Sequence, residues 1–384
     1  MKNSHNSERI QTIVIGGGQA GLAVGYYLAK RGLHFQILDA SLRIGDAWRN
    51  RWDSLRLFTP ARYASLPGLR FPGGGSSFPT KDQVADYLED YAQRFHLPVR
   101  TGVRVERLWK EGDRFVITVG EQRFEADNVV VAMANYQTPR VPTFARDLKP
   151  EILQMHSHHY RNPSQLQDGG VLVVGVGNSG ADISLEVAQS HPTWLAGKES
   201  GQIPWRIDTF FATFFLVRLM RFLGHHILTV KTPIGRKLRP RMISNAAPLG
   251  RVRTQDLIDA RVQRVPRVVG VRNGLPLVSD GGTLDVKNVI WCTGYRHDFP
   301  WIDLPVFDDG EPRHAAGIVA EAPGLYFVGL HFLYSLTSAT LFGIGRDAKR
   351  IVKALALRTP LQSVVDDRAL VVNAQELVES NYKG

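Results

Sequence analysis

Three glycines near the start of the chain have the spacing of a loop that binds a dinucleotide. Gly16, Gly18 and Gly21 follow an apolar run at 12–15 and precede a helix-forming run, after which a second apolar run ends at Asp39. In such loops the first glycine permits a tight turn, the second admits a pyrophosphate, and the third lets the helix pack on the strand. The helix N-terminus offers N–H groups to the phosphates. Because Asp39 can accept hydrogen bonds from both ribose hydroxyls, this loop is predicted to bind FAD.

The same pattern recurs at Gly175, Gly177 and Gly180, after an apolar run at 171–174. Asp39 lies 23 residues after Gly16, and Lys198 lies 23 residues after Gly175. A lysine at this offset suits a 2′-phosphate, so the second loop is predicted to bind NADPH. The neighbouring Glu199 leaves NADH open as an alternative, and a solvated surface lysine is the plainer interpretation of Lys198.

Three histidines, His156, His158 and His159, lie within four positions and could suggest a metal site. A metal site requires three or four ligands at fixed geometry. These side chains would point in different directions in any regular element, and no carboxylate or cysteine lies near them in the sequence. We therefore predict no metal.

The elements that position these residues belong to a chain of 384 residues, long enough for two domains. Lysines and arginines exceed acidic residues by 47 − 36 = 11, which favours anionic ligands such as nucleotides. No nucleic-acid motif is present, so a nucleic-acid partner is not expected. The single cysteine, Cys292, excludes an internal disulfide and a CxxC redox pair. The polar start lacks a secretory signal, and a cytoplasmic location is predicted.

The predicted fold class is α/β, with two Rossmann-like dinucleotide-binding domains and the NADPH domain inserted in the FAD domain. We expect the FAD domain at 1–163 and 288–384, and the NADPH domain at 164–287 with a helical excursion at 204–253. The strands that end near 131 and 291 are each followed by a hinge-like turn. The second of these strands is expected to return to the first domain.

Residues 207–241 mix phenylalanine and leucine runs with basic residues. One interpretation is a helical excursion that packs against the NADPH domain. The other is a lipophilic substrate entrance or a peripheral membrane contact, in which basic residues meet anionic headgroups. Arg218 and Arg221 interrupt the most apolar window and argue against a membrane span.

Several segments resemble the flavin-containing monooxygenase family, in the family's order along nearly the whole chain. They include GGGQAG at 16–21, GDAWRNRWDSLRLFTP at 45–60, HSHHY at 156–160, GVGNSG at 175–180 and WCTGY at 291–295. The stretch LRLFTPARYASLPGLRFP is especially similar to YUCCA-type enzymes and their bacterial relatives.

The resemblance implies two sets of cofactor-binding residues. FAD would be held by Gly16, Gly18, Gln19, Ala20, Gly21, Asp39, Trp48, Val103, Ala132 and Thr337, and the nicotinamide cofactor by Gly175, Gly177, Asn178, Ser179, Gly180 and Lys198. Trp48 would lie near the flavin ring and Val103 near the adenine. Thr337 and Ser338 are expected to cap a helix whose N-terminus faces the flavin.

The family's linker fingerprint is matched by His156 and Tyr160. We interpret His156 as a residue that fixes the relative orientation of the two domains, whereas His158 and His159 are expected to face solvent. One departure from the family is Ala134, at the hinge position where the family normally has glycine.

The resemblance implies an NADPH- and O2-dependent monooxygenase that acts on a small lipophilic substrate at nitrogen, sulfur or a carbonyl carbon, through a C4a-(hydro)peroxyflavin. No side chain is predicted to be catalytic, since the flavin carries the chemistry. A disulfide reductase would need a second cysteine. Two alternatives remain, a ferredoxin-reductase-like electron-transfer enzyme and a dinucleotide-binding protein without turnover.

Overall fold

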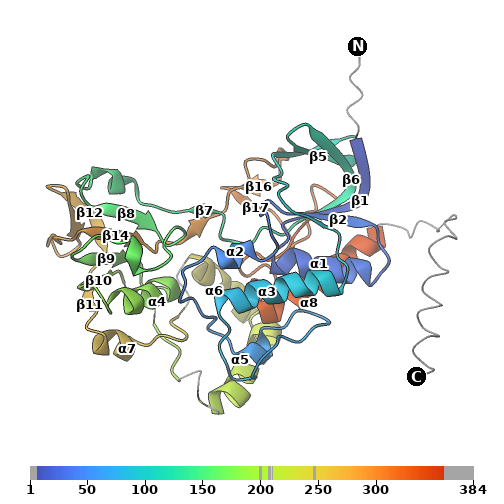
Figure 1. Ribbon diagram of the computed structural model, residues 1–384. Coiled ribbons are helices and arrows are strands. Elements are labelled where there is room, and N and C mark those ends of the chain that lie inside the picture. Colours follow the sequence, from blue (N-terminus) through green and yellow to red (C-terminus); the bar gives the residue numbers. More distant parts are fainter. Residues whose placement is uncertain (1–6, 199–200, 206–208, 210, 245–247, 359–384) are drawn as a thin grey trace, which may run out of the picture.

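The computed structural model describes residues 7–198, 201–205, 209, 211–244 and 248–358. Within these ranges the chain builds two separate sheets, one mixed and one fully parallel, joined by a short two-stranded ribbon (Figure 1). The prediction of two Rossmann-like units is confirmed.

The first sheet has the strand order β3-β2-β1-β6-β5-β4, and β18 also pairs with β6. Its first four strands in that order are parallel, as is β18, whereas β5 pairs antiparallel with β6 and β4 pairs antiparallel with β5. The strands are β1 (Ser7–Ile15), β2 (Phe35–Leu38), β3 (Val99–Arg100), β4 (Arg107–Glu111), β5 (Arg114–Val119), β6 (Gln122–Val131) and β18 (Leu325–Phe327).

Both faces of the first sheet are covered, which explains its continuous apolar strands. Val14 packs into the core under α1 (Gln19–Ala29), α3 (Lys81–Arg94) and α8 (Leu341–Arg358), while its neighbours Ile13 and Ile15 face the core on the other side. The C-terminal helix α8 lies against α1, so the two ends of the described chain complete one domain.

The second sheet is fully parallel, with the order β11-β10-β9-β14-β8. Its strands are β8 (Leu153–His156), β9 (Val171–Val174), β10 (Thr193–Ala196), β11 (Gln263–Val265) and β14 (Asn288–Trp291). Val171 and Val173 face one core and Leu172 and Val174 the other, so this sheet is also buried on both sides. The helices α4 (Asn178–Val187) and α7 (Thr254–Asp259) lie in this part of the chain.

The predicted limits between the domains are wrong at two strands. The strand at 288–291, expected to return to the first domain, pairs with β9 and β8 in the second sheet, and β8 itself lies within the predicted 1–163 segment. Both strands are short and precede a turn, and this pattern does not identify the sheet to which a strand belongs. The chain leaves the first sheet after β6 and enters the second at β8.

The crossing segments pair with each other. The ribbon consists of β7 (Thr138–Pro139) and β15 (Tyr295–Arg296), which run antiparallel between the two sheets (Figure 1). Ala134 and Gly294, the residues just before these strands, both have positive φ, +59° and +80°. The two predicted hinge turns therefore lie side by side.

The remaining elements are short or belong to the excursion after β10. They are α2 (Asp46–Arg49), η1 (Ala61–Tyr63), η2 (Thr143–Asp147), η3 (Pro163–Gln165), the antiparallel pairs β12 (Val268–Arg272) with β13 (Leu275–Val278) and β16 (Phe307–Asp308) with β17 (Glu311–Pro312), and the excursion helices η4 (Ala212–Leu216), α5 (Val217–Phe222), η5 (Leu223–Ile227) and α6 (Pro233–Ser244).

Candidate functional site

The first glycine loop connects β1 to α1 with very close packing. Gly16 has φ +108°, and a Cβ on Gly21 would lie 1.8 Å from the carbonyl oxygen of Gly16. No side chain larger than hydrogen fits at Gly21, because the first turn of the helix rests on the end of the strand. Gly18, in contrast, faces open space, since nothing lies within 4 Å of a Cβ built there. This is the space that a pyrophosphate needs.

The N-terminus of α1 is open toward the same space. Gly18 is the N-cap in an extended conformation, with no side-chain cap and no acidic residue in the first turn of the helix. The side chain of Gln19 donates a hydrogen bond to the carbonyl of Ala339 (3.1 Å), and its Oε1 is buried without a partner among the described residues. The free N–H groups and the positive end of the helix dipole favour an anion here.

Asp39 lies at the end of β2, fixed by backbone donors. Its carboxylate accepts hydrogen bonds from the amides of Gly17 and Ser41, the latter at 2.7 Å. Each oxygen keeps a lone pair for a ribose hydroxyl. The amide of Val103 donates to the Asp39 carbonyl (2.8 Å). Asp39 and Val103, both predicted to bind FAD, are therefore adjacent.

Ala132 and Trp48, also predicted to bind FAD, lie on different elements of the first domain. Ala132 directly follows β6 beside the loop, where its carbonyl oxygen lies 2.8 Å from a Cβ built on Gly16. Trp48, on α2, is half-buried and packs against the cores of both domains. The structure thus places Trp48 at the junction between the domains.

The helix predicted near Thr337 begins later than expected. α8 starts at Leu341, and the prediction that Ser338 caps it is wrong, because Ser338 Oγ accepts hydrogen bonds from the amides of Tyr334 and Ser335 (3.0 Å each). The hydroxyl of buried Thr337 contacts that of Ser335 at 3.0 Å. The two predicted caps instead stabilise the turn that precedes the helix.

The second loop repeats the geometry of the first. Gly175 has φ +117°, and a Cβ on Gly180 would lie 1.8 Å from the Gly175 carbonyl oxygen. α4 begins after Gly177, again in an extended conformation without a side-chain cap or an acidic residue in the first turn. The Asn178 side chain accepts from the amide of Gly250 (2.9 Å) and donates to the carbonyl of Pro248 (3.2 Å). The half-buried Ser179 follows in the first turn.

Lys198 lies two residues beyond β10 and is exposed. β10 pairs with β9 in parallel, as β2 pairs with β1, and the amides of Gly16 and Gly175 donate to the carbonyls of Leu38 and Ala196 respectively. By this register Gly197 occupies in the second unit the place that Asp39 has in the first, and Lys198 is the next residue. Glu199 lies outside the described residues.

His156 is buried in the hinge, and both of its ring nitrogens are engaged. Nδ1 accepts a hydrogen bond from the amide of His158 (3.1 Å), so Nε2 carries the proton and donates to the carbonyl of Gly294 (3.0 Å). Burial lowers the pKa of His156 to about 4, which keeps the ring neutral. The bond joins β8 of the second sheet to the crossing segment just before β15.

The other residues of the histidine segment have separate environments. His159 is exposed, but the expectation that His158 faces solvent is wrong: it is half-buried, and its ring lies 6.0 Å from that of Tyr295. Tyr160 is fully buried and donates to Glu186 on α4 (2.8 Å). Within the described ranges, no three His, Cys, Asp or Glu side chains are grouped to hold a metal ion.

The hinge also contains residues that the sequence did not single out. The Arg51 guanidinium donates to the hydroxyl of Tyr295 (2.5 Å) and lies 5.1 Å from the ring centroid of Tyr136. The two tyrosine rings pack edge to face at 5.3 Å, yet Tyr136 remains 56% exposed. The two tyrosines, Tyr136 and Tyr295, closely follow the predicted hinge turns at Ala134 and Gly294. Their positions beside these turns could have indicated that they lie at the hinge.

Cys292 does not carry the chemistry of a reactive thiol. It follows β14 and is half-buried, and desolvation raises its pKa to about 12. At neutral pH the side chain is therefore a protonated thiol, which is a poor nucleophile.

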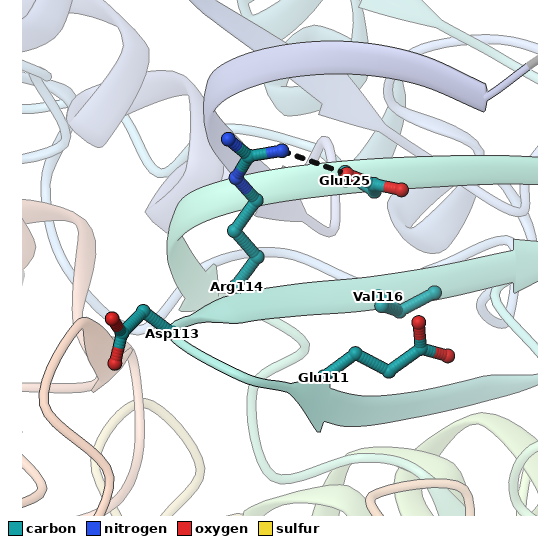
Figure 2. Close-up of a pocket in the computed structure, with 5 residues that line it drawn as sticks. All are labelled: Glu111, Asp113, Arg114, Val116 and Glu125. Atoms are coloured by element: carbon teal, nitrogen blue, oxygen red, sulfur yellow. Dashed lines mark hydrogen bonds and ion pairs between the residues drawn. The ribbon is translucent and has the colours of Figure 1, made fainter.

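A surface hollow on the β4–β5–β6 face is lined by Glu111, Asp113, Arg114, Val116 and Glu125 (Figure 2). Arg114 and Glu125 form an ion pair at 3.1 Å, drawn as the dashed line. None of the predicted site residues lines this hollow, so it is not the candidate site.

Comparison with known proteins connects the geometry to enzymes. The model of the pyridine nucleotide-disulphide oxidoreductase family matches residues 13–197, which include both glycine loops. An uncharacterised CzcO-like oxidoreductase from Geobacillus kaustophilus is 39% identical, over 89% of this chain and 97% of the relative. The indole-3-pyruvate monooxygenase YUCCA1 of Oryza sativa is 29% identical, over 92% of this chain and 94% of the relative.

A solved structure has the same architecture. The flavin-containing monooxygenase of Stenotrophomonas maltophilia superimposes with a TM-score of 0.71 at 28% identity, and the alignment covers 91% of this chain and 99% of that one. With a single cysteine, this chain has no second thiol with which to form an internal disulfide.

Proposed function

This chain belongs to the flavin-containing monooxygenase family, and from that premise we propose that it uses NADPH and O2 to oxygenate a small lipophilic substrate. The oxygen acceptor would be a nitrogen, a sulfur or a carbonyl carbon. The chain is an FAD-dependent oxidoreductase, and the proposal concerns its nicotinamide preference, its substrate and the fate of the oxygen.

The duplicated loop geometry is the observation that carries the proposal. Both domains have a helix N-terminus without a side-chain cap beside a closely packed glycine, which supports two places for a dinucleotide in one chain. Two such places would let one protein hold both a hydride donor and a hydride acceptor. A single-cofactor dehydrogenase would need only one such loop.

The residues at the first loop fit FAD. Gly18 leaves room for the pyrophosphate, the α1 N–H groups face it, and Asp39 would hold the ribose. When bound, the flavin would accept hydride from the reduced nicotinamide and activate O2 for transfer to the substrate. The protein's part is to position the two cofactors and to exclude water from the reacting atoms.

The second loop would hold NADPH in preference to NADH. Asn178 ties the loop to the 248–250 segment, and Lys198 presents a positive charge at the strand end where a 2′-phosphate would lie. Lys198→Ala should raise KM for NADPH about tenfold, roughly the effect of removing one charged hydrogen bond, and leave KM for NADH unchanged. An equal change for both cofactors would argue against a role in 2′-phosphate binding.

The function is tested by a screen of amines, sulfides and ketones for substrate-stimulated NADPH oxidation. The expected product contains one more oxygen atom than the substrate, and this atom carries the label when isotopically labelled O2 is supplied. Fast reduction of a one-electron acceptor, with no oxygenated product from any substrate, would favour the electron-transfer alternative. Slow or absent flavin reduction by NADPH would contradict both.

A further inference from the structure

The excursion between β10 and β11 exposes many large apolar side chains on the surface. Between 211 and 243 eight such residues are more than a third exposed, over half of those in the whole described structure. They are Phe211, Phe215, Leu219, Met220, Phe222, Ile227, Ile234 and Ile243. Large apolar side chains exposed together in one segment indicate an interaction site, whereas single exposed residues do not.

The apolar residues of the first helical run share one face. Phe211, Phe215, Leu219 and Phe222 are spaced by four, four and three residues over η4 and α5, which is the repeat of one helix face. The rings of Phe211 and Phe215 stack at 5.3 Å, and Phe211 is 61% exposed. We call the exposed side chains of η4, α5, η5 and α6 the excursion face.

The opposite side of the excursion is anchored to the first domain. Leu228 accepts a hydrogen bond from the amide of Leu336 (3.0 Å), and the amide of Val230 donates to the carbonyl of Tyr334 (2.9 Å). Arg346 on α8 donates to the carbonyl of His225 (2.8 Å). The segment is therefore seated firmly on one side, and α5 points away from both sheets (Figure 1).

The charge of the excursion has a single sign. Residues 209–255 contain nine lysines and arginines and no aspartate or glutamate. Arg218 and Arg221 flank the apolar stripe on α5, and both are exposed. Three more exposed basic residues lie just before and on α6, namely Lys231, Arg236 and Lys237.

We propose that the excursion face docks this enzyme on an anionic membrane surface. An interfacial helix places its aromatic and leucine side chains at the boundary of the acyl chains and its basic residues at the headgroups, which matches this arrangement. Within the described residues no helix is long and apolar enough to cross a bilayer, so the contact is peripheral. A second copy fits poorly, because a symmetric contact would bring the same uncompensated charge against itself.

Vesicle co-sedimentation of the full FAD-loaded chain tests the proposal. Binding to phosphatidylcholine vesicles that contain phosphatidylglycerol should be strong, should weaken with added salt, and should be much weaker without the anionic lipid. The Arg218→Glu/Arg221→Glu variant should lose partitioning roughly fivefold or more for each arginine. Phe215→Ser/Leu219→Ser should also release the protein while FAD content and NADPH-dependent flavin reduction stay unchanged.

Matched controls lie on other elements. Arg31→Glu/Arg146→Glu makes the same charge change, and Leu42→Ser removes an apolar side chain that is 85% exposed. Both controls should bind vesicles like the natural chain. Equal binding by all variants, or no preference for anionic lipid, would overturn the proposal. Concentration-dependent dimers that Phe215→Ser/Leu219→Ser abolishes, without vesicle binding, would assign the face to a second copy.

Discussion

At the scale of single residues, the first nucleotide loop combines two glycines under opposite constraints. Gly21 is required by packing, since its hydrogen faces the Gly16 carbonyl, and any substitution there disturbs the fold. Gly18 is free of contacts within the protein, so its lack of a side chain matters only to what enters the open space. Fold and ligand binding can therefore be separated by mutation.

Gly18→Ala should weaken FAD binding about tenfold or more. It should lower the free energy of unfolding of the FAD-free protein by no more than a few tenths of a kcal/mol. The added methyl group would occupy space that the pyrophosphate needs. FAD titration and urea unfolding measure the two effects. Gly74→Ala, at another glycine with no neighbour within 4 Å, is the control and should leave FAD affinity unchanged. Normal affinity in Gly18→Ala would place the pyrophosphate elsewhere.

Ala134 shows backbone strain at the hinge. Its φ of +59° is a left-handed conformation that costs an alanine about 1–2 kcal/mol and a glycine very little. Ala134→Gly should therefore raise the free energy of unfolding by about 0.5 kcal/mol, after the greater backbone entropy of glycine is subtracted. Ala134→Val should lower it by about 1 kcal/mol or more, because a β-branched residue tolerates this region least. Urea unfolding of both variants checks the pair, and the opposite order would contradict it.

At the scale of elements, the crossing strands β7 and β15 connect the two domains. The amide of Arg140 donates to the Gly294 carbonyl at 3.0 Å, and His156 donates to the same carbonyl. This carbonyl therefore joins both crossing segments and β8. Arg51 contributes from the first domain through the hydroxyl of Tyr295. Loss of any one of these hydrogen bonds should let the two domains, and the cofactors bound to them, shift relative to each other. Each domain should remain folded.

His156→Ala should reduce the product formed per NADPH oxidised severalfold while FAD content stays near that of the natural chain. The Gly294 carbonyl would keep the Arg140 amide as a donor but lose its hydrogen bond from β8, which is worth about 0.5–1.5 kcal/mol, and the domains could then shift. Oxygen uptake and hydrogen peroxide release, compared with product yield, measure the coupling. His156→Asn, whose amide can also donate, should recover part of it, and exposed His159→Ala is the control. Unchanged coupling in His156→Ala would refute the role in orientation.

The sequence predicts elements better than it predicts their partners. The strand at 171–174 and both glycine loops were predicted because their chemistry is local, with each residue serving a turn, a helix start or a ribose. The sheet of β14 was mispredicted because strand pairing is a long-range property. The cluster of Arg51, Tyr136 and Tyr295 escaped prediction for the same reason, since its members are far apart in the chain and meet only at the hinge.

At the scale of the whole molecule, the two domains are stabilised by groups that burial keeps neutral. His156 in the hinge and His225 in η5 of the excursion are 3% and 6% exposed, and burial lowers the pKa of each to about 4 from 6.5. The unfolded chain binds protons at these sites near pH 6.5, whereas the folded chain binds them only near pH 4. Their contribution to stability is therefore complete above pH 6.5 and is lost as the pH falls toward 4.

Asp182 on α4 opposes this trend. Burial raises its pKa to about 6, so the folded chain binds this proton more readily than the unfolded chain and gains stability as the pH falls from about 6 toward 3.8. The two histidines outweigh this carboxyl, and His314, whose pKa burial also lowers to about 4, adds to the loss. Each unbalanced proton contributes at most about 1.4 kcal/mol per pH unit. The interface between domains and excursion should thus weaken under mild acid.

Urea unfolding over a series of pH values should show a free energy of unfolding that is constant above pH about 7 and declines below about 6.5. His156→Gln and His225→Gln should each be less stable at neutral pH and show a shallower decline, because a glutamine does not take up the proton. His191→Gln, at a partly exposed site, is the control and should keep the slope of the natural chain. An unchanged slope in both buried variants would mean that other groups cause the acid sensitivity.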